Sequence, residues 1–326
     1  MKKIIFAMAI VLAVAGGIFA QNTAGNPSAV PTLAAASPGD SAAGLKPAII
    51  SYLNAAPDSA NYMMDIATAR KALEENAKGC LVLDIRKPDI YASGHIPGAI
   101  NVPVADIGAN FDKIRAAAQG KTVIAVCEIG VGAGQVAALL NVAGTKAVDL
   151  KDGMGGAGGG FQLTAPKGWL GAGYPVTPTP ATLPDAPALP DNQAPIVHAV
   201  RDYFLNLPAD INVIRPVDFK GLRTDMATNP DADVFLDIRK PEDFANGHIP
   251  GAMNYAFGPD LVRNLDIISE KAKGKTLVVV SASGQTAGQA VALFNLLGVH
   301  AKDIGYGFDG WDKFVKRESK ASEGGK

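Results

Sequence analysis

Short apolar runs alternate with longer helical stretches along most of the chain. A short apolar run ends in Asp84-Ile85-Arg86, and continuous apolar runs lie at 122–126 and 276–280. Continuous runs are typical of strands that are buried on both faces of a sheet. Helical stretches at 107–118 and 261–273 precede two of these runs. The alternation predicts an α/β fold with open, mainly parallel sheets and helices on both faces.

The second strong pattern is an internal repeat. The segment 83–103, LDIRKPDIYASGHIPGAINVP, returns at 236–256 as LDIRKPEDFANGHIPGAMNYA, with 14 of 21 positions identical. A near-copy of this length predicts two copies of one domain rather than one large core. We expect the first domain at 45–163 and the second at 196–315, each of about 120 residues, which is enough for an independent core.

The remaining segments are polar or rich in proline. Residues 164–195 form a proline-rich stretch that is typical of a semi-rigid linker. Residues 21–44 are rich in Ala, Pro, Ser and Gly and are typical of a flexible tether. Residues 316–326 form a polar tail, which we expect to be frayed.

The N-terminus predicts export. Residues 1–20 place Lys2 and Lys3 before an apolar run with small residues at its end, which is typical of a cleaved signal peptide. The alternative is an uncleaved N-terminal anchor. Cleavage predicts a periplasmic or secreted protein without a membrane span. The whole chain has a net charge of −1, and loss of the two lysines makes it more acidic, so charge gives no case for binding nucleic acid.

Two cysteines remain in this expected exported chain. Oxidising compartments favour disulfides. Cys80, however, comes just before one predicted strand, and Cys127 comes just after another. If those strands are parallel neighbours, the two residues lie at opposite ends of the sheet, whereas bridged Cα atoms come within about 7 Å of each other. The order therefore predicts two free thiols.

The segment that follows the run 122–126 is the main candidate for chemistry. In an open parallel sheet, reactive groups lie beyond the carboxyl ends of the strands. A thiol between a strand and a helix N-terminus meets backbone N–H groups that lower its pKa and can hold an anion. Glycines let the backbone wrap closely around the sulfur. These features suit a persulfide or a phosphorylated cysteine, although a buried strand-end cysteine can also be a small hydrophobic residue. The loop consists of Cys127, Glu128, Ile129, Gly130, Val131 and Gly132.

Several motifs together resemble the rhodanese family. They are Asp84-Ile85-Arg86, the stretch 94–103 and the Cys127 loop in the first repeat, and Asp237-Ile238-Arg239, 247–254 and 307–311 in the second. The resemblance implies that Cys127 takes a sulfane sulfur as a persulfide. The sulfur would come from a small sulfur-containing donor or a persulfide protein and pass to a thiol or cyanide-like acceptor, without a cofactor.

The tandem arrangement resembles two-domain thiosulfate or mercaptopyruvate sulfurtransferases, in which the second domain is usually the active one. Here the first copy carries the cysteine. Glu128 and Ile129 stand where thiosulfate enzymes of the family place basic residues, and Ile90 stands where two-domain enzymes place a substrate-binding Arg. Thiosulfate is therefore not the expected donor. Related phosphatases have an Arg six positions after the Cys, where this chain has Ala133, so phosphatase activity is not expected.

The equivalent loop of the second repeat begins with a serine. A serine hydroxyl without a partner base is a weak nucleophile, and it cannot form a persulfide. The second repeat is interpreted as a non-catalytic partner that completes the cleft, or alternatively as a binding module with intact loop amides. For the whole chain, the competing function is a non-catalytic binding or scaffold protein that recognises an anion or a protein partner. The degenerate loop consists of Ser281, Ala282, Ser283, Gly284, Gln285 and Thr286.

The other polar residues that both copies share are predicted to have structural roles. Asp84 and Arg86 are expected to form a buried ion pair behind the loop, and His95 to stabilise its turn, because the copy without cysteine keeps all three residue types. The segment 153–158 fits G-x-G-x-x-G, but no first βαβ unit precedes it, so a dinucleotide site is not expected. We interpret it as an aromatic-poor version of 307–311. No Cys/His cluster has metal-ligand spacing.

Overall fold

The computed structural model describes residues 42–56, 61–155, 167–185, 187, 189 and 194–323. The expected signal peptide at 1–20 and nearly all of the expected tether at 21–44 lie outside these residues. Among the helices that are described, none is long and apolar enough to cross a bilayer.

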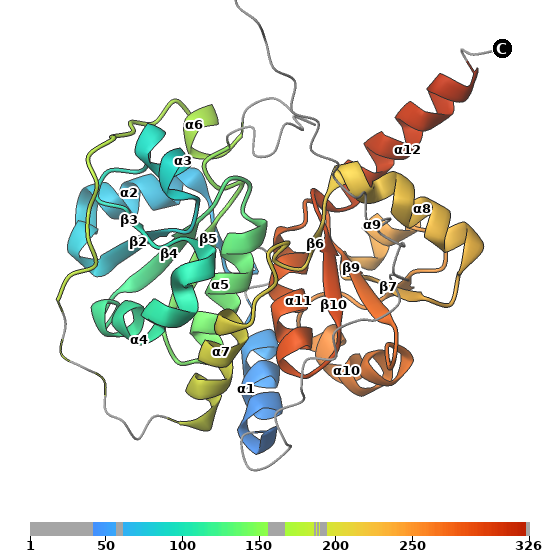
Figure 1. Ribbon diagram of the computed structural model, residues 1–326, viewed down its shortest axis with the longest axis horizontal. Coiled ribbons are helices and arrows are strands. Elements are labelled where there is room, and N and C mark those ends of the chain that lie inside the picture. The colour runs from blue at the N-terminus through green and yellow to red at the C-terminus, as the bar shows by residue number, and fades with distance from the viewer. Residues whose placement is uncertain are drawn as a thin grey trace, which may run out of the picture. The chain divides into compact units, whose positions relative to one another are not determined.

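Two five-stranded sheets, each entirely parallel, form the centre of the fold (Figure 1). The first has the order β1-β5-β4-β2-β3 and the second has the matching order β6-β10-β9-β7-β8. This confirms the predicted pair of α/β domains. The strands are β1 (Met63–Met64), β2 (Cys80–Asp84), β3 (Ile100–Asn101), β4 (Thr122–Val126), β5 (Ala147–Leu150), β6 (Val213–Ile214), β7 (Asp233–Asp237), β8 (Met253–Asn254), β9 (Thr276–Val280) and β10 (Ala301–Ile304).

Helices cover both faces of each sheet (Figure 1). They are α1 (Ala42–Asn54), α2 (Ile66–Asn76), α3 (Pro88–Ser93), α4 (Ile107–Ala117), α5 (Val131–Val142), α6 (Gly168–Gly171), α7 (Pro195–Leu205), α8 (Phe219–Thr228), α9 (Pro241–Ala245), α10 (Pro259–Lys271), α11 (Gln285–Leu296) and α12 (Gly307–Glu323), with short 3-10 turns at Ala77–Gly79, Val104–Asp106 and Pro216–Asp218. The helices α3 and α9 each begin at a proline, which suits a first helical turn because its missing N–H would have no partner there.

The strands divide their side chains between two cores. In β2, Leu81 and Leu83 belong to the core that also contains α4 and α5, whereas Val82 belongs to the core beneath α2, α3 and α6. Successive side chains of a strand point to opposite faces, so an unbroken apolar run is what a sheet covered on both sides requires. The second sheet alternates in the same way between two cores.

The helices that follow the two loops, α5 and α11, pack directly against each other. A Cβ at Gly134 would lie 2.7 Å from the Gln285 carbonyl oxygen, and a Cβ at Gly288 would lie 2.6 Å from the Val131 carbonyl oxygen. Only glycine permits so close an approach of the two backbones. The ends of both loops are therefore held together at the contact between the domains.

Two helices cross the domain boundaries that the repeat predicts. The helix α7, expected in the second domain, packs on α4 of the first: Phe204 lies 5.9 Å from Phe111 between ring centroids, and Arg201 pairs with Asp112 at 3.5 Å. The helix α1, expected in the first domain, reaches α10 of the second through a pair between Lys46 and Asp266. Helices at the start of a repeat have no strand partner to hold them, so the nearest apolar face decides their position.

Part of the expected linker belongs to the first domain. Trp169 of α6 is 2% exposed and lies in the core beneath α2 and α3. Its indole N–H donates to the carbonyl of Pro175 at 2.9 Å. The boundary expected at residue 163 is thus too early. The segment 153–158 has no aromatic residue, as described, and Trp169 further along the chain is buried in the first domain as Trp311 is in the second.

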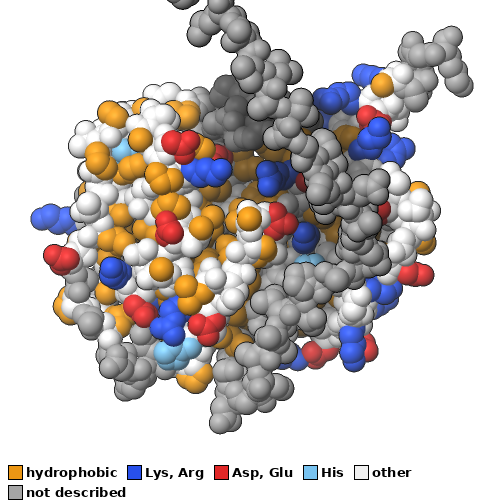
Figure 2. All heavy atoms as spheres, viewed as in Figure 1, with side chains coloured by type: hydrophobic (Ala, Val, Ile, Leu, Met, Phe, Trp, Pro, Cys, Tyr) orange, Lys and Arg blue, Asp and Glu red, His pale blue; other side chains and the backbone are white. Residues whose placement is uncertain are grey.

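The polar tail differs from its expected frayed form. Residues 316–323 continue α12, with Lys316 and Asp312 paired one turn apart. On the face shown in Figure 2, Lys and Arg side chains lie among Asp and Glu side chains. A mixed surface of this kind produces no field of a single sign.

Candidate functional site

Cys127 lies directly after β4, at the carboxyl end of the first sheet. β4 and β2 are parallel neighbours, and Val126 pairs with Asp84. The chain leaves β2 for β3 on one side and returns for β4 on the other, so the strand order reverses between them. In open α/β sheets, ligands bind at such a reversal, outside the carboxyl ends of the strands. The structure therefore places Cys127 where the sequence predicts it.

The second thiol is at the other end of the same strands. Cys80 begins β2 and pairs with Thr122, the first residue of β4. Both cysteines are free thiols, in agreement with the order of the strands.

The loop closes its backbone around the sulfur. The Gly130 N–H donates to Cys127 Sγ at 3.1 Å. Gly130 caps α5 with a φ of +93°, a left-handed conformation that costs glycine little and other residues much more. Gly132 follows in the first turn of α5 and is fully enclosed with Val131, whereas Glu128 and Ile129 are half-buried. The six residues thus form one short turn with Cys127 at its centre.

The electrostatics of this thiol differ from the expectation. The pKa of Cys127 is raised to about 12: burial raises it most, the negative charge of Glu128 also raises it, and the amides of Ala133, Ile129 and Gly130 lower it. The loop amides therefore act in the predicted direction. Their lowering of the pKa is smaller than the raising by burial, because Cys127 is only 5% exposed and burial penalises a thiolate.

The order of thiol labelling follows from this. Under mild alkylation at neutral pH, Cys80 is expected to react first, because it is half-buried while Cys127 is buried. Burial also raises the pKa of Cys80, although Lys146 opposes that shift. We expect Cys127 to react at least about tenfold more slowly, since almost none of it is thiolate at neutral pH. Peptide mapping after timed alkylation measures both rates, and faster reaction of Cys127 would contradict the burial argument.

A side chain of the second domain enters the Cys127 loop. A Cβ at Gly130 would overlap the side-chain amide of Gln285. That amide donates to Asp149 Oδ2 at 2.9 Å, and its oxygen accepts from the Asp152 N–H at 3.0 Å. The sequence predicts Gln285 only as a member of the degenerate second loop. The structure makes it part of the wall of the first.

Asp149 ends up fully buried between the domains. Gln289 donates to its Oδ1 at 3.2 Å, and Gln285 donates to its Oδ2. Burial raises the pKa of Asp149 well above its usual value, and these two amides oppose the shift. Gln289 also accepts from the Tyr52 hydroxyl at 2.9 Å. The sequence contains one signal for this network: the second loop has Gln285 where the first has Val131.

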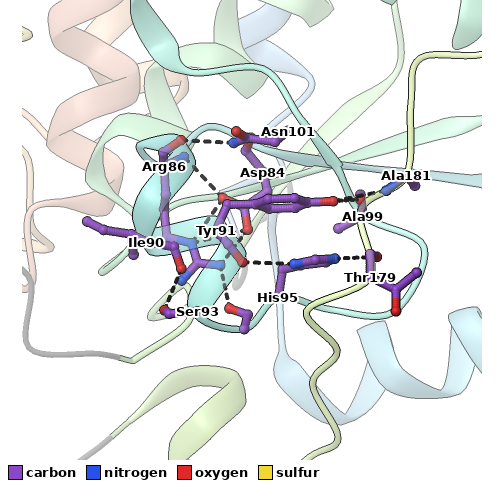
Figure 3. A network of polar contacts seen from close by, with 11 residues as sticks. Asp84, Arg86, Ile90, Tyr91, Ser93, His95, Ala99, Asn101, Thr179 and Ala181 are labelled. Carbon is purple, nitrogen blue, oxygen red and sulfur yellow. Dashed lines mark hydrogen bonds and ion pairs between the residues drawn. The ribbon is translucent and has the colours of Figure 1, made fainter.

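Behind the loop, Asp84 and Arg86 form the expected buried ion pair (Figure 3). The Arg86 Nη2 donates to Asp84 Oδ2 at 2.7 Å and to the Gly94 carbonyl at 2.9 Å. Asn101 donates to the carbonyls of Asp84 and Arg86 at 2.9 Å. The network ties the end of β2 to the turn before β3, and Asp84 pairs with Val126, the residue before Cys127, so it supports the strand end from which the loop departs.

His95 is held on three sides in the same network (Figure 3). Its Nδ1 lies 2.8 Å from the Tyr91 carbonyl, and its Nε2 lies 2.9 Å from the Thr179 carbonyl. Its ring stacks on Tyr91 at 3.6 Å. The ring is fully buried, and none of these contacts involves Cys127. The expected structural role of His95 explains all of them.

The glycine-rich turn after β5 holds the loop from its backbone side. The Met154 N–H donates to the Cys127 carbonyl at 2.8 Å, and the Gly155 N–H donates to the Glu128 carbonyl at 2.9 Å. In the second domain, Phe308 and Asp309 donate to the Ser281 and Ala282 carbonyls in the same way. The predicted G-x-G-x-x-G segment is therefore a support for the loop. Its residues 156–158 lie outside the described part of the chain.

The model of the rhodanese-like domain matches residues 67–156 and again residues 222–314. The chain belongs to the rhodanese-like domain family. Comparison with curated proteins gives no match.

Solved structures similar to this chain include further rhodanese-like proteins. Thiosulfate sulfurtransferase from Pseudomonas aeruginosa is 21% identical over 80% of this chain and 46% of its own, with a TM-score of 0.33. A rhodanese-related protein from Thermoplasma volcanium is 25% identical over 36% of this chain and 98% of its own, with a TM-score of 0.28. A rhodanese-like domain protein from Staphylococcus aureus is 25% identical over 31% and 97%, with a TM-score of 0.26.

The second rhodanese-like domain keeps the loop geometry and loses the thiol. Ser281 Oγ accepts from the N–H groups of Gly284 and Ala287, each at 3.1 Å. Gly284 has a φ of +91°, as Gly130 has +93°. The hydroxyl therefore takes the place of the sulfur in an otherwise equal turn, with both lone pairs engaged.

The two rhodanese-like domains differ most at a buried carboxyl. Asp303 of the second is the counterpart of Asp149 and is equally buried, yet neither of its side-chain oxygens has a hydrogen-bond partner among the described residues. Val131 lies opposite Asp303, at the position that Gln285 occupies opposite Asp149. Burial raises the pKa of Asp303 well above its usual value. In the described part of the chain, no group of three or more His, Cys, Asp or Glu residues is placed to bind a metal ion.

Proposed function

We propose that the first rhodanese-like domain carries a sulfane sulfur on Cys127 and passes it to a nucleophilic acceptor. The observation that carries this proposal is the turn around the sulfur: a strand-end cysteine, followed by a loop whose Gly130 N–H lies 3.1 Å from Sγ. Amides in this arrangement suit a persulfide anion, because they offer hydrogen bonds to negative charge. The family to which the domain belongs supports the same chemistry.

The transfer needs no oxidant or reductant beyond the donor and the acceptor. The Cys127 thiolate attacks the outer sulfur of a persulfide or polysulfide, and a new S–S bond forms as the old one breaks. A persulfide donor leaves as its thiolate, and a polysulfide leaves as an anion shorter by one sulfur. An acceptor nucleophile then attacks the outer sulfur, and Cys127 leaves as the thiolate. Because burial keeps the thiol protonated at neutral pH, the first step requires its transient exposure, through separation of the Gln285 side chain from the loop.

Mass spectrometry of the purified full chain tests the proposal. After exposure to polysulfide, the mass gain of one sulfur atom is expected on the peptide that contains Cys127, and cyanide should remove it. An unmodified Cys127 in a protein that still folds would overturn the proposal. That outcome would favour the competing class, a non-catalytic protein that recognises an anion or a protein partner with the loop amides.

The charge of Glu128 predicts which donor is used. Thiosulfate is a dianion, and Glu128 places like charge beside the thiol, whose pKa it raises. Replacing Glu128 with Lys is expected to raise the rate of thiosulfate use about tenfold, because it lowers the thiol pKa and attracts the donor. Steady-state assays with thiosulfate and with polysulfide measure this, with Glu128→Gln as the intermediate control. Rapid thiosulfate turnover by the wild type, unchanged in both variants, would show that the local charge does not decide the donor.

We further propose that the protein acts outside the cytoplasm. Residues 1–20 carry the basic start and apolar run of a secretory signal, which supports a periplasmic or secreted location. N-terminal sequencing of the mature protein, recovered from fractionated cells, tests this. A start at Gln21 in an exported fraction is the expected result, and an intact N-terminus in the membrane fraction would favour the anchor.

A further inference from the structure

In the first domain, the edge of the sheet is covered by residues 175–183, named here the strap. Thr177 and His95 exchange backbone hydrogen bonds of 3.1 and 2.9 Å. Ala181 pairs with Ile100 of the edge strand β3 and donates its N–H to the Tyr91 hydroxyl at 3.2 Å. Figure 1 shows this segment, in yellow-green, following the outer edge of the first sheet. The strap therefore pairs with this edge at two isolated bridges, antiparallel at His95 and parallel at Ile100, which is a partial form of the pairing by which an extended peptide binds a sheet edge.

The strap also covers apolar side chains at this edge. Ala181 and Leu183 pack against the core to which Leu81 and Ile100 belong. An edge strand left open exposes unpaired backbone groups and its apolar neighbours to water. In the first domain, the strap pairs with backbone groups of this edge and covers its apolar side chains.

Among the described residues, no segment covers the same edge of the second domain. β8 is its edge strand, and in the described part of the chain the backbone of His248 has no partner like Thr177. The His248 side chain is exposed, whereas that of His95 is completely buried. A cavity of about 330 Å³ opens beside β8, with Met253 and Val234 in its wall.

Strand register identifies this cavity with the place that the strap covers. Leu236 pairs with Met253 as Leu83 pairs with Ile100, so Met253 is the counterpart of Ile100. By the same repeat, Val234 is the counterpart of Leu81, which lies in the core that Leu183 covers. The cavity in the second domain thus lies where a strap would place its aliphatic side chains.

The charges around the cavity narrow the kind of segment that fits. Lys271 and Lys275 line it together with Asp231 and Asp233. Lys275 lies 3.8 Å from Asp231, while no acidic partner of Lys271 is found among the described residues. The strap is followed by Asp185, two positions after Leu183. In an extended segment two residues span about 7 Å, so an acid at that spacing comes within reach of the Lys271 ammonium.

We propose that this edge of the second domain binds an extended, proline-rich segment of a partner protein. The segment pairs with the backbone at His248 and β8, places a leucine in the cavity and directs an acidic side chain two residues later to Lys271. The interaction is independent of Cys127, because it uses the outer edge of the other domain.

A labelled peptide with the sequence of residues 174–185 is the probe, titrated against the full chain and followed by fluorescence anisotropy. Saturable binding is expected. Lys271→Glu should weaken it severalfold, and Lys121→Glu, the same charge change in the first domain at the counterpart of Lys275, should leave it unchanged. Phe244→Tyr should tighten it about fivefold, because it restores the hydroxyl that Tyr91 offers to Ala181, and one such hydrogen bond is worth about 1 kcal/mol.

Three outcomes would overturn the proposal. The first is no binding to either the wild type or Phe244→Tyr, with thermal unfolding showing that both are folded. The second is equal binding to the wild type and Lys271→Glu. The third is binding that Lys121→Glu weakens and Lys271→Glu does not, because the peptide would then be exchanging with the strap at the first domain.

Discussion

Cys127→Ser is expected to abolish sulfur transfer from polysulfide to cyanide, down to the rate without protein. An oxygen in place of the sulfur cannot form the S–S bond on which the transfer depends. The fold should survive, because the second domain shows how a serine sits in this turn: Ser281 Oγ accepts two loop amides at 3.1 Å. Formation of thiocyanate, measured over time with the loaded protein, reports the loss.

Ser281→Ala is the matched control in the other domain. It removes an acceptor from the buried N–H groups of Gly284 and Ala287, so the free energy of unfolding should fall by about 1–3 kcal/mol. The rate of transfer per folded molecule should stay unchanged. Equal loss of activity in the two variants would refute the division into one active and one inactive domain.

The fold was predictable from the sequence because its signals are local. Unbroken apolar runs specify strands buried on both faces, and the copied segment at 83–103 and 236–256 specifies two domains. The strands β1 and β6 are only two residues long and have no pattern to detect. The strap was misassigned to a linker because its position depends on a buried Trp169 and on His95, about 80 residues earlier in the chain.

The position of the site was predictable from the sequence, but the predicted lowering of the Cys127 pKa was wrong. The strand-to-helix junction identifies Cys127 and the amides around it. The pKa of the thiol depends instead on how completely α11 encloses the loop, and that enclosure is a contact between residues 136 apart, such as Gln285 and Asp149. Pairwise comparison of the copies could have indicated it, since Gln285 against Val131 is a change from apolar to amide in otherwise matched loops.

The difference between Gln285 and Val131 at matched positions of the two loops predicts a second large effect. Gln285→Val is expected to lower the free energy of unfolding by about 2–4 kcal/mol, because it leaves the buried Asp149 Oδ2 and the Asp152 N–H without their partner. It also removes the side chain that closes the Cys127 loop, so alkylation of Cys127 should accelerate. Urea unfolding and timed labelling measure the two effects separately.

The reverse change, Val131→Gln, should act in the opposite direction. It offers an amide to Asp303, whose Oδ2 lies 3.3 Å from where a Cβ of Gly284 would stand. Asp303 is matched to Asp149 in position and burial, and it lacks only this partner within the described residues. The expected gain is about 1 kcal/mol at neutral pH.

The pH dependence of these variants distinguishes a new hydrogen bond from a change in packing. Burial raises the pKa of Asp303, so the folded chain keeps a proton that the unfolded chain releases above about pH 4. The contribution of Asp303 to wild-type stability should therefore fall as pH rises from about 4 towards the folded pKa, and stay at its lower level beyond it. An amide that donates to the carboxylate lowers the folded pKa, which makes the fall smaller in Val131→Gln. A variant that is less stable than the wild type at every pH, with an unchanged slope, would mean that the space opposite Asp303 does not admit the amide and that the two halves of this contact are not equivalent.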